Sequence, residues 1–270
     1  MKKLIALDLD GTLLNSAGIT TEYTKKILKS ANDAGYYIVP VTGRSISHVP
    51  KWLLETDFIE YIITANGARC ISTRTDLRSL NDMMKKEQML RVLSIGSLIG
   101  EKLFVSWNLH IDGKVYREDN FGEPRPMNPR LVLPMDMYDY VEQFGDKTEI
   151  EKMDAYFKDA EQKNRVLKAV KSFDDMYISS ANENNIEFNN KTANKGNALK
   201  KLAKLLDVYL KNSMAFGDGL NDLTMLNAVV ISVAMGNSAV ELKNKAKYIA
   251  KSCDEDGVAI FINDYLKRKA

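Results

Sequence analysis

The chain has 270 residues, of which 45% are hydrophobic, and its 38 lysines and arginines nearly balance its 36 aspartates and glutamates, for a net charge of +2. At roughly 150 residues per domain, this length favours one large domain or two modest ones, and the hydrophobic content excludes wholesale disorder. The near-balanced charge argues against a dedicated nucleic-acid binder, which usually carries a basic excess. Two cysteines without a CxxC pair support neither a disulfide framework nor a zinc site.

The apolar runs of the chain are short. The N-terminal run ends at Asp8, before the roughly 7–15 residues of a secretion signal core are reached. The longest apolar run, residues 228–236, is well short of the roughly 20 residues that span a bilayer. We therefore expect a cytoplasmic protein that binds neither membrane nor nucleic acid, and no pattern in the sequence indicates its oligomeric state.

The first third of the chain alternates short apolar runs with amphipathic stretches. A helix capped by Thr20 or Thr21 is expected to end at Gly35, and a second helix is expected from the turn at Gly43 to about Thr56. The apolar runs predict strands over residues 4–9, 37–41 and 59–64. This β-α-β-α-β order predicts a parallel sheet with right-handed crossovers.

The last third repeats this pattern, and the middle differs from it. Helices are expected over 195–206, 222–226, 241–246 and 259–266, and strands over 213–216, 229–234 and 248–250. In the middle, a helix over 83–98, a strand over 103–110, a turn at Asp112-Gly113, a proline-rich loop (Pro124, Pro126, Pro129) and strands over 176–179 and 186–188 are expected. We predict an α/β fold: a doubly wound parallel-sheet core (residues 1–81 and 189–270) with an inserted α+β domain (residues 82–188).

The strongest local pattern is Asp8-Leu9-Asp10-Gly11-Thr12, placed where an apolar strand ends. Ligands of open parallel sheets bind beyond the carboxyl ends of the strands, and two adjacent carboxylates there repel unless a cation joins them. Oxygen ligands suit Mg²⁺. On its own, however, a DxD pair is equally well explained as two turn aspartates.

Three further polar motifs lie at strand-to-helix junctions or helix starts. Gly217-Asp218-Gly219-Leu220-Asn221-Asp222 offers a third carboxylate and amides for a phosphate, although Asn221 alone reads as an ordinary helix cap. Thr42-Gly43-Arg44 resembles an anion site, with Arg44 either reaching a substrate or pairing at the surface. Lys195 opens a helix, where a cation is mildly unfavourable unless an anion lies nearby. Together the four motifs supply the groups that phosphoryl transfer needs.

With these motifs in this order, the chain resembles the haloacid dehalogenase-like (HAD) superfamily, in its Cof-like sugar-phosphatase branch. Further matches are Asn66-Gly67-Ala68, the run 233–237 and the run 254–259, and the resemblance spans nearly the whole chain. It implies a Rossmann-like HAD core with an inserted cap domain that selects the substrate. Cys253 stands where such proteins often carry asparagine.

The resemblance implies a magnesium-dependent phosphatase of small phosphorylated metabolites, sugar phosphates above all. In such an enzyme Asp8 attacks phosphorus and Asp10 serves as general acid and base. Asp8, the Asp10 carbonyl and Asp218 are expected to bind Mg²⁺, with Asp222 behind them. Phosphate contacts are expected from the residues Leu9, Thr42, Gly43, Lys195 and Asn221, and substrate contacts from Arg44 and Asn66.

Substrate choice is left open by the sequence, because the cap matches the family loosely. The segment Trp107–Asp112 is a candidate for specificity; in the alternative interpretation, Trp107 and Leu109 belong to the cap core and His110 is exposed. Two other functions remain on this scaffold: a phosphomutase and a catalytically silent phosphate-binding regulator. A dinucleotide-binding oxidoreductase is disfavoured, since no GxGxxG follows the first strand.

Overall fold

The computed structural model describes residues 2–75, 78–119, 132–180 and 183–268. Contacts divide the chain into two compact units. The first, here called the core unit, consists of Met1–Thr42, Pro50–Leu80 and Lys195–Ala270. The second, here called the cap unit, consists of Gly43–Val49 and Asn81–Asn194, so a seven-residue segment far from the main insertion belongs to it.

A five-stranded parallel sheet forms the centre of the core unit. Its order is β14-β13-β12-β1-β2, and every neighbouring pair is parallel. The strands are β1 (Lys3–Leu7), β2 (Tyr36–Pro40), β12 (Met214–Gly217), β13 (Ile231–Ala234) and β14 (Tyr248–Ile249). The predicted α/β fold with a parallel sheet is confirmed, and polar motifs from both ends of the sequence follow the central strands β1 and β12.

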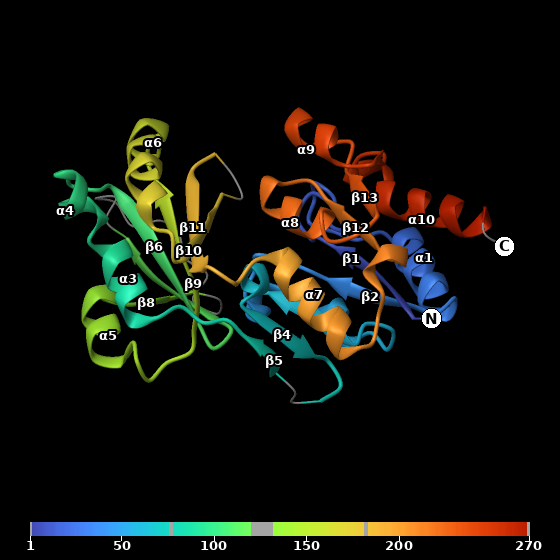
Figure 1. Ribbon diagram of the computed structural model, residues 1–270, viewed down its shortest axis with the longest axis horizontal. Helices are drawn as coiled ribbons and strands as arrows, with labels where there is room; N and C mark the ends of the chain where they lie inside the picture. The colour runs from blue at the N-terminus through green and yellow to red at the C-terminus, as the bar shows by residue number, and fades with distance from the viewer. Residues whose placement is uncertain (1, 76–77, 120–131, 181–182, 269–270) are drawn as a thin grey trace. The chain divides into compact units, whose positions relative to one another are not determined.

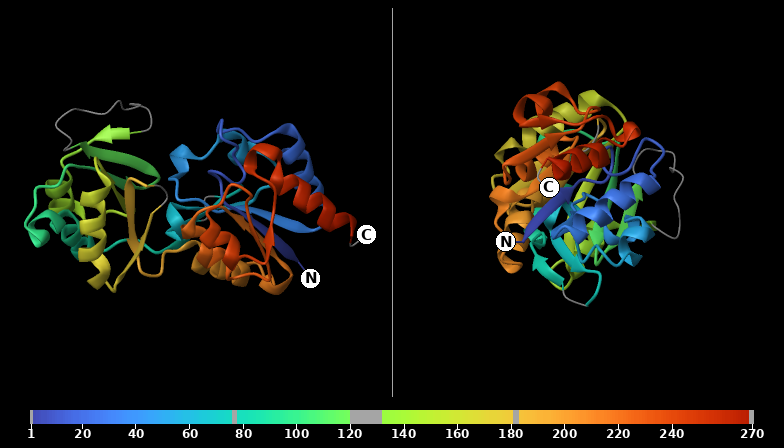
Figure 2. Two further views of the ribbon diagram at one scale, coloured as in Figure 1. Left: turned by 90° about the horizontal axis from the view of Figure 1, so that it is seen from above. Right: turned by 90° about the vertical axis from the view of Figure 1, so that its right-hand side faces the viewer.

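Helices cover both faces of this sheet (Figure 2, left). Side chains alternate along β12: Ala215 joins an apolar cluster with Leu199 of α7 and Leu242 of α9, while the Phe216 ring meets Phe261 of α10 edge-on. The helix α10 also packs against α1, whose cap residue Thr21 accepts a hydrogen bond from the amide of Thr24. The helices are α1 (Glu22–Asp33), α7 (Lys195–Leu205), α8 (Leu223–Leu226), α9 (Val240–Lys245) and α10 (Gly257–Lys267).

Two predictions for the first third were wrong in detail. The expected continuous helix from Gly43 to Thr56 is a 3₁₀ turn, η1 (Ile46–His48), and a separate short helix, α2 (Lys51–Glu55). Pro50 separates them, because a proline disfavours helical geometry in the residue before it. The expected third parallel strand, β3 (Tyr61–Thr64), joins the main sheet through one bridge, Val41 to Ile63, and pairs antiparallel with β4 (Arg69–Ser72). A third strand, β5 (Arg78–Asn81), completes that small sheet.

The cap unit is built on a second sheet, of order β10-β11-β9-β6-β7-β8. Its helices lie on one face (Figure 1), where Trp107, Leu109, Met153 and Phe188 pack into an apolar cluster. The strands are β6 (Val105–Ile111), β7 (Lys114–Asp119), β8 (Val132–Pro134), β9 (Ile150–Phe157), β10 (Met176–Ser179) and β11 (Asn185–Asn190). The helices are α3 (Lys86–Leu93), α4 (Ile95–Ile99), α5 (Met137–Phe144) and α6 (Ala160–Ala169). The single helix expected over 83–98 is therefore two, α3 and α4.

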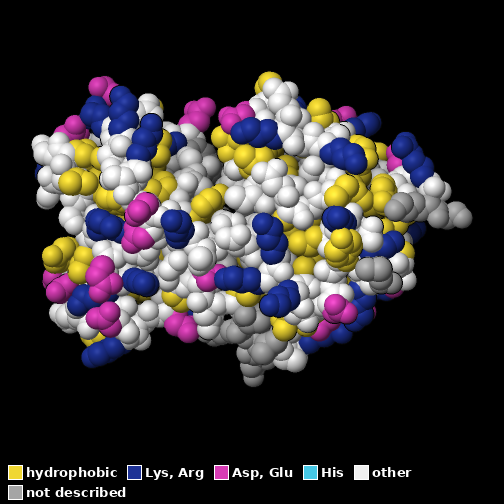
Figure 3. Space-filling view, in the orientation of Figure 1, with side chains coloured by type: hydrophobic (Ala, Val, Ile, Leu, Met, Phe, Trp, Pro, Cys, Tyr) yellow, Lys and Arg dark blue, Asp and Glu magenta, His cyan; other side chains and the backbone are white. Residues whose placement is uncertain are grey.

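Short 3₁₀ turns complete the described chain: η2 (Ala65–Gly67), η3 (Val170–Ser172), η4 (Leu210–Asn212), η5 (Leu220–Asp222) and η6 (Cys253–Glu255). The predicted proline-rich loop lies outside the described residues. Positive and negative side chains are interspersed over the face in Figure 3, in keeping with the small net charge. In the described part of the chain, every helix is too short or too polar to cross a bilayer.

Candidate active site

Asp8 and Lys195 form the centre of the site. Asp8 follows β1 and is held there by its amide, which donates to the carbonyl of Phe216 in β12 at 3.1 Å. Lys195, the first residue of α7, places Nζ 2.5 Å from Asp8 Oδ1 and 2.6 Å from Asp222 Oδ1. Lys195 is 1% exposed and Asp8 7% exposed. The lysine placed against the helix dipole is thus explained by two buried carboxylates that surround its ammonium group.

Asp222 organises the loop that follows β12. Its Oδ2 accepts the amides of Asp218 and Gly219, each at 3.0 Å, while its Oδ1 faces Lys195. The buried Asp222 therefore fixes both the lysine and the neighbouring turn. One carboxylate oxygen from each of Asp8, Asp218 and Asp222 lies within 4.8 Å of the other two.

Two glycines permit this close arrangement. Gly11 has φ +74°, and a Cβ there would lie 2.3 Å from Asp218 Oδ2. A Cβ on Gly217 would lie 2.4 Å from the Cβ of Asp222. Only a residue without a side chain fits at either position, which accounts for the glycines in both motifs.

The three carboxylates carry more negative charge than the one lysine balances. Burial and the charge of Asp222 raise the pKa of Asp8 well above its ordinary value, against the opposing effect of Lys195. Burial and Asp222 also raise the pKa of Asp218 to about 6. Burial by itself lowers the pKa of Lys195. The negative charges of Asp222 and Asp8 outweigh this effect and raise the pKa above its ordinary value, so the lysine stays charged. A cation or protons must therefore compensate the remaining negative charge.

The other predicted residues of the core unit lie at the same carboxyl ends of the strands. Thr42 is buried beyond β2, and its carbonyl accepts the amide of Asn66 at 3.0 Å. Asn66 is buried in η2 with φ 57°, between Ala65 and Gly67, which also have positive φ. Two of these three residues are not glycine, so their left-handed backbone is strained, and such strain concentrates at functional sites. Leu9 and Asn221 are buried, whereas Asp10 is exposed and its carboxylate is outside the group formed by the other three aspartates.

The remaining two predicted residues, Gly43 and Arg44, belong to the cap unit. They open the segment Gly43–Val49, in which the Arg44 guanidinium donates to the carbonyl of His48 at 2.8 Å. The structure thus brings Asp8, Lys195, Asp218 and Asp222 together in one unit. It places Gly43 and Arg44 in the other unit, directly after Thr42 in the chain.

Thr12 and Asn237 contact this site, although the sequence motifs gave neither residue an individual role. The Thr12 hydroxyl donates to Asp218 Oδ1 at 3.0 Å, so a residue of the first motif, 8–12, orients a carboxylate of the motif 217–222. The Asn237 amide donates to the carbonyl of Gly11 at 2.8 Å and accepts the amide of Cys253 at 2.9 Å. Both residues stood in motifs quoted for the family resemblance, but only the fold shows which partner each one holds.

The specificity candidate Trp107–Asp112 contributes to both faces of the cap sheet. Trp107 and Leu109 lie in the apolar cluster, as the alternative interpretation expected. The same interpretation expected an exposed His110, and this is wrong: the residue is buried, at 5% exposure. Its Nε2 lies 2.7 Å from Asp154 Oδ2, and its Nδ1 is hydrogen-bonded to Ser45. Because Ser45 belongs to the segment Gly43–Val49, His110 joins that segment to the cap sheet.

A buried charged cluster continues from His110 across the same sheet face. Lys152 Nζ lies 3.0 Å from Asp154 Oδ1 and 2.9 Å from Glu187 Oε1, and all three residues are nearly inaccessible to solvent. Burial raises the pKa of Asp154, but Lys152 and His110 outweigh that effect and lower it to about 2. Lys152, Asp154 and Glu187 were not among the predicted residues, because each strand contributes only one or two of them and they meet only across the sheet.

Comparison with known families identifies the family of this chain. The chain matches the family of haloacid dehalogenase-like hydrolases over residues 5–262, and it belongs to that family. The expected fold class and enzyme class, a phosphatase of this family, are confirmed.

Relatives of similar length are named as phosphatases. The chain is 28% identical over 264 residues to the 5-amino-6-(5-phospho-D-ribitylamino)uracil phosphatase YcsE of Bacillus subtilis, covering 98% of this chain and 96% of that protein. It is 31% identical over 292 residues to the putative phosphatase YxeH of Bacillus subtilis, covering all of both chains. Among solved structures, a haloacid dehalogenase-like hydrolase from B. subtilis has TM-score 0.81 at 26% identity, covering 97% of this chain and 99% of that one. A subclass IIB sugar phosphatase of the superfamily has TM-score 0.83 at 21% identity, covering 98% and 99%, and shows the shared fold.

Proposed function

We propose that this protein is a Mg²⁺-dependent phosphatase of small phosphorylated metabolites, with sugar phosphates as the substrate class, and that Asp8 is its nucleophile. The observation that carries the proposal is the buried Asp8 carboxylate held 2.5 Å from Lys195 at the carboxyl end of β1. A carboxylate fixed in this way has lost its rotational freedom before a substrate arrives, which favours attack on a bound phosphorus.

Two aspartates have separate roles in the reaction: Asp8 is the nucleophile, and Asp10 is the general acid and base. An Asp8 oxygen attacks phosphorus, the P–O bond to the leaving alcohol breaks, and an aspartyl-phosphate remains. Asp10 gives its proton to the leaving alkoxide and then takes one from the water that hydrolyses the intermediate. The exposure of Asp10, in contrast to the burial of Asp8, suits a group that exchanges protons with alcohol and water.

The donor set fits a hard divalent cation. Three clustered carboxylates face one lysine, and oxygen ligands with excess negative charge suit Mg²⁺. We assign Asp8, the Asp10 carbonyl and Asp218 as its ligands, with Asp222 holding Lys195 and the loop behind them. When bound, Mg²⁺ supplies positive charge between the nucleophile and the phosphoryl oxygens.

Phosphate contacts are assigned to groups at the same ends of the strands and to the residues that directly follow Thr42 in the chain. The assigned donors are the Leu9 amide, Thr42, Gly43, Lys195 and Asn221, with Arg44 and Asn66 toward the rest of the substrate. The relative YcsE is named for a phosphorylated ribityl compound, which supports a phosphate ester of a polyhydroxylated carbon chain as the substrate of this protein. The cytoplasm, where such metabolites occur, is the compartment that we assign.

The test is a set of phosphorylated metabolites assayed for phosphate release with and without Mg²⁺, on wild type, Asp8→Asn and Asp218→Asn. We expect Asp8→Asn to abolish turnover and Asp218→Asn to raise the Mg²⁺ concentration needed for half-maximal rate. Asp33→Asn is the matched control, because Asp33 is an exposed partner of Lys29 on α1. Near-wild-type turnover in Asp8→Asn would refute the nucleophile assignment.

The same assay separates the alternatives. A phosphomutase would return the phosphoryl group to sugar and need a bisphosphate activator, so phosphate release without an activator excludes it as the main activity. A silent regulator would bind phosphate esters without releasing phosphate from any of them. Among these functions, the intact set of acids and lysine favours the phosphatase.

A further inference from the structure

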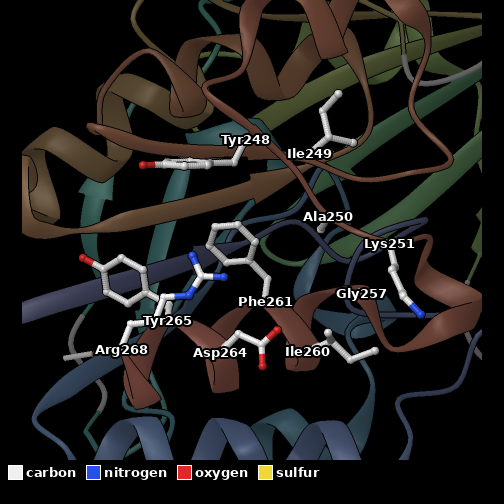
Figure 4. A pocket seen from close by; sticks show the side chains of 10 residues that line it. All are labelled: Tyr248, Ile249, Ala250, Lys251, Gly257, Ile260, Phe261, Asp264, Tyr265 and Arg268. Carbon is white, nitrogen blue, oxygen red and sulfur yellow. The ribbon is translucent and has the colours of Figure 1, made fainter. Parts of the chain in front are cut away.

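A groove of about 440 Å³ lies between the edge strand β14 and the helix α10, entirely within the core unit (Figure 4). Two strands, β13 and β12, separate β14 from β1 in the sheet. The groove shares no residue with the candidate active site. Its volume falls in the range of pockets for small molecules, about 300–1,000 Å³.

One side of the groove is aromatic and held in place. Phe261 meets Phe216 edge-on with ring centroids 5.4 Å apart, and Phe216 is fully buried in β12. Phe261 also meets Tyr248 with centroids 5.6 Å apart. Figure 4 shows the rings of Phe261 and Tyr265, from α10, and of Tyr248, from β14, toward the same end of the groove. Because the buried Phe216 holds Phe261, and Phe261 in turn contacts Tyr248, a planar ligand would meet rings that are partly ordered before it binds.

The polar groups of the groove carry a net positive charge. Two cations, Arg268 and Lys251, and one anion, Asp264, line it. Asp264 lies on α10 and Arg268 caps that helix four residues later, yet the described part of the chain shows no ion pair between them. Within the described ranges, the ammonium group of Lys251 has one ion-pair partner, Glu255 at 4.0 Å. The groove can therefore pair with an anion and, through Asp264, accept a hydrogen bond from an N–H group.

The edge strand itself is protected against pairing with another strand. It has two residues, and Lys247 and Lys251 flank it on both sides. A very short edge strand bordered by lysines is a common defence against strand addition. A small ligand therefore fits this edge better than a second copy of the chain.

We propose that the groove between β14 and α10 is a second binding site, for a planar aminoheteroaromatic anion. The ring stacks on the aromatic side, its amino or ring N–H donates to Asp264, and its anionic group pairs with Arg268, which Figure 4 shows beside the rings of Tyr265 and Phe261.

The test uses pterin-6-carboxylate as a fluorescent probe, titrated with the full chain in the presence of saturating inorganic phosphate. Pterin keeps the ring and amino group without the anion, and naphthalene-2-carboxylate keeps a ring and the anion without the amino group. We expect each analogue to bind about tenfold more weakly than the probe. Absence of probe binding, or equal binding of either analogue, would overturn the assigned ligand class.

Variants locate the binding. We expect Arg268→Gln and Asp264→Asn each to weaken probe binding about tenfold. Lys267→Gln, a neighbouring cation on α10 that does not line the groove, is expected to leave it unchanged. Asp8→Asn is also expected to leave probe affinity unchanged, because the two sites share no residue. If Asp8→Asn abolished probe binding, or if Arg268→Gln and Lys267→Gln bound equally well, the proposed site would be refuted.

Discussion

The ammonium group of Lys195 lies 2.5 Å from the carboxylate of Asp8, although 187 residues separate them in the chain. Their contact depends on β1 and β12 being neighbours in the parallel sheet, since Lys195 is held by Asp222 from the loop after β12. The nucleophile proposed here is thus positioned by both halves of a core that the cap insertion divides in the sequence.

We expect Lys195→Met to lower kcat/KM by at least about 100-fold, because the variant loses charge-assisted hydrogen bonds in a buried site. The loss of the cation should also raise the pKa of Asp8 further, so the acidic limb of the pH–rate profile should move to higher pH. Lys200→Met is the matched control, an exposed lysine on the same helix. A profile that keeps its wild-type acidic limb would contradict the assigned role.

Thr12 provides a subtler test, because its hydroxyl donates to the carboxylate of Asp218 at 3.0 Å. Thr12→Val keeps the shape and loses the donor, and we expect it to raise the Mg²⁺ concentration for half-maximal rate about 5–10-fold. Thr12→Ser keeps the donor and should stay within about twofold of wild type. Equal Mg²⁺ dependence in the two variants would show that the hydroxyl does not orient Asp218.

Much of the core was predictable from local patterns. Short apolar runs followed by Asp8 and by Asp218 indicated parallel strands whose carboxyl ends meet, and β1 and β12 are indeed neighbours. The identity of each partner was not predictable in this way. Nothing local in the sequence says that Thr12 donates to Asp218 or that Asp222 turns one oxygen to Lys195 and the other to the loop.

The cap was harder to predict, for a physical reason. Its buried charges come from separate antiparallel strands: His110 from β6, Lys152 and Asp154 from β9, and Glu187 from β11. In the sequence, each looks like a surface residue of a strand in which polar and apolar residues alternate. Only the register with which β9 pairs with β6 and β11 brings the four side chains together. The segment Gly43–Val49 joins this unit by contacts such as Ser47 to Gly113, which no local pattern encodes.

Gly196 tests the packing that holds Lys195. A Cβ there would lie 2.1 Å from the backbone oxygen of Thr224 in α8, so Gly196→Ala should force α7 and α8 apart. We expect a loss of about 1–3 kcal/mol in the free energy of unfolding, measured by urea denaturation, together with lower activity. Lys200→Ala places alanine at an exposed position of the same helix and should change stability by less than about 0.5 kcal/mol. Wild-type stability in Gly196→Ala would contradict the close approach of the two helices.

Asp154 gives a pH-dependent prediction for the cap. Burial raises the pKa of its carboxyl, but Lys152 and His110 lower it further, from 3.8 to about 2. Between about pH 2 and about pH 4 the Asp154 carboxyl binds a proton in the unfolded chain but not in the folded chain. The ionised carboxylate therefore stabilises the folded state fully above about pH 4, and this contribution is lost as the pH falls to about 2. The lowering of this pKa to about 2 corresponds to about 2 kcal/mol of stability at neutral pH.

Asp154→Asn should remove that contribution and leave Lys152 with Glu187 as its remaining carboxylate partner. We expect the variant to be about 3 kcal/mol less stable than wild type at pH 7, with the difference shrinking as the pH falls from about 4 to about 2. The measurement is urea unfolding followed by the fluorescence of Trp107, which lies in the cap cluster, in a Trp52→Phe background. Asp33→Asn, at an exposed site, should match wild type throughout. A stability difference that stays constant from pH 7 to pH 2 would mean that the charge of Asp154 does not stabilise the cap.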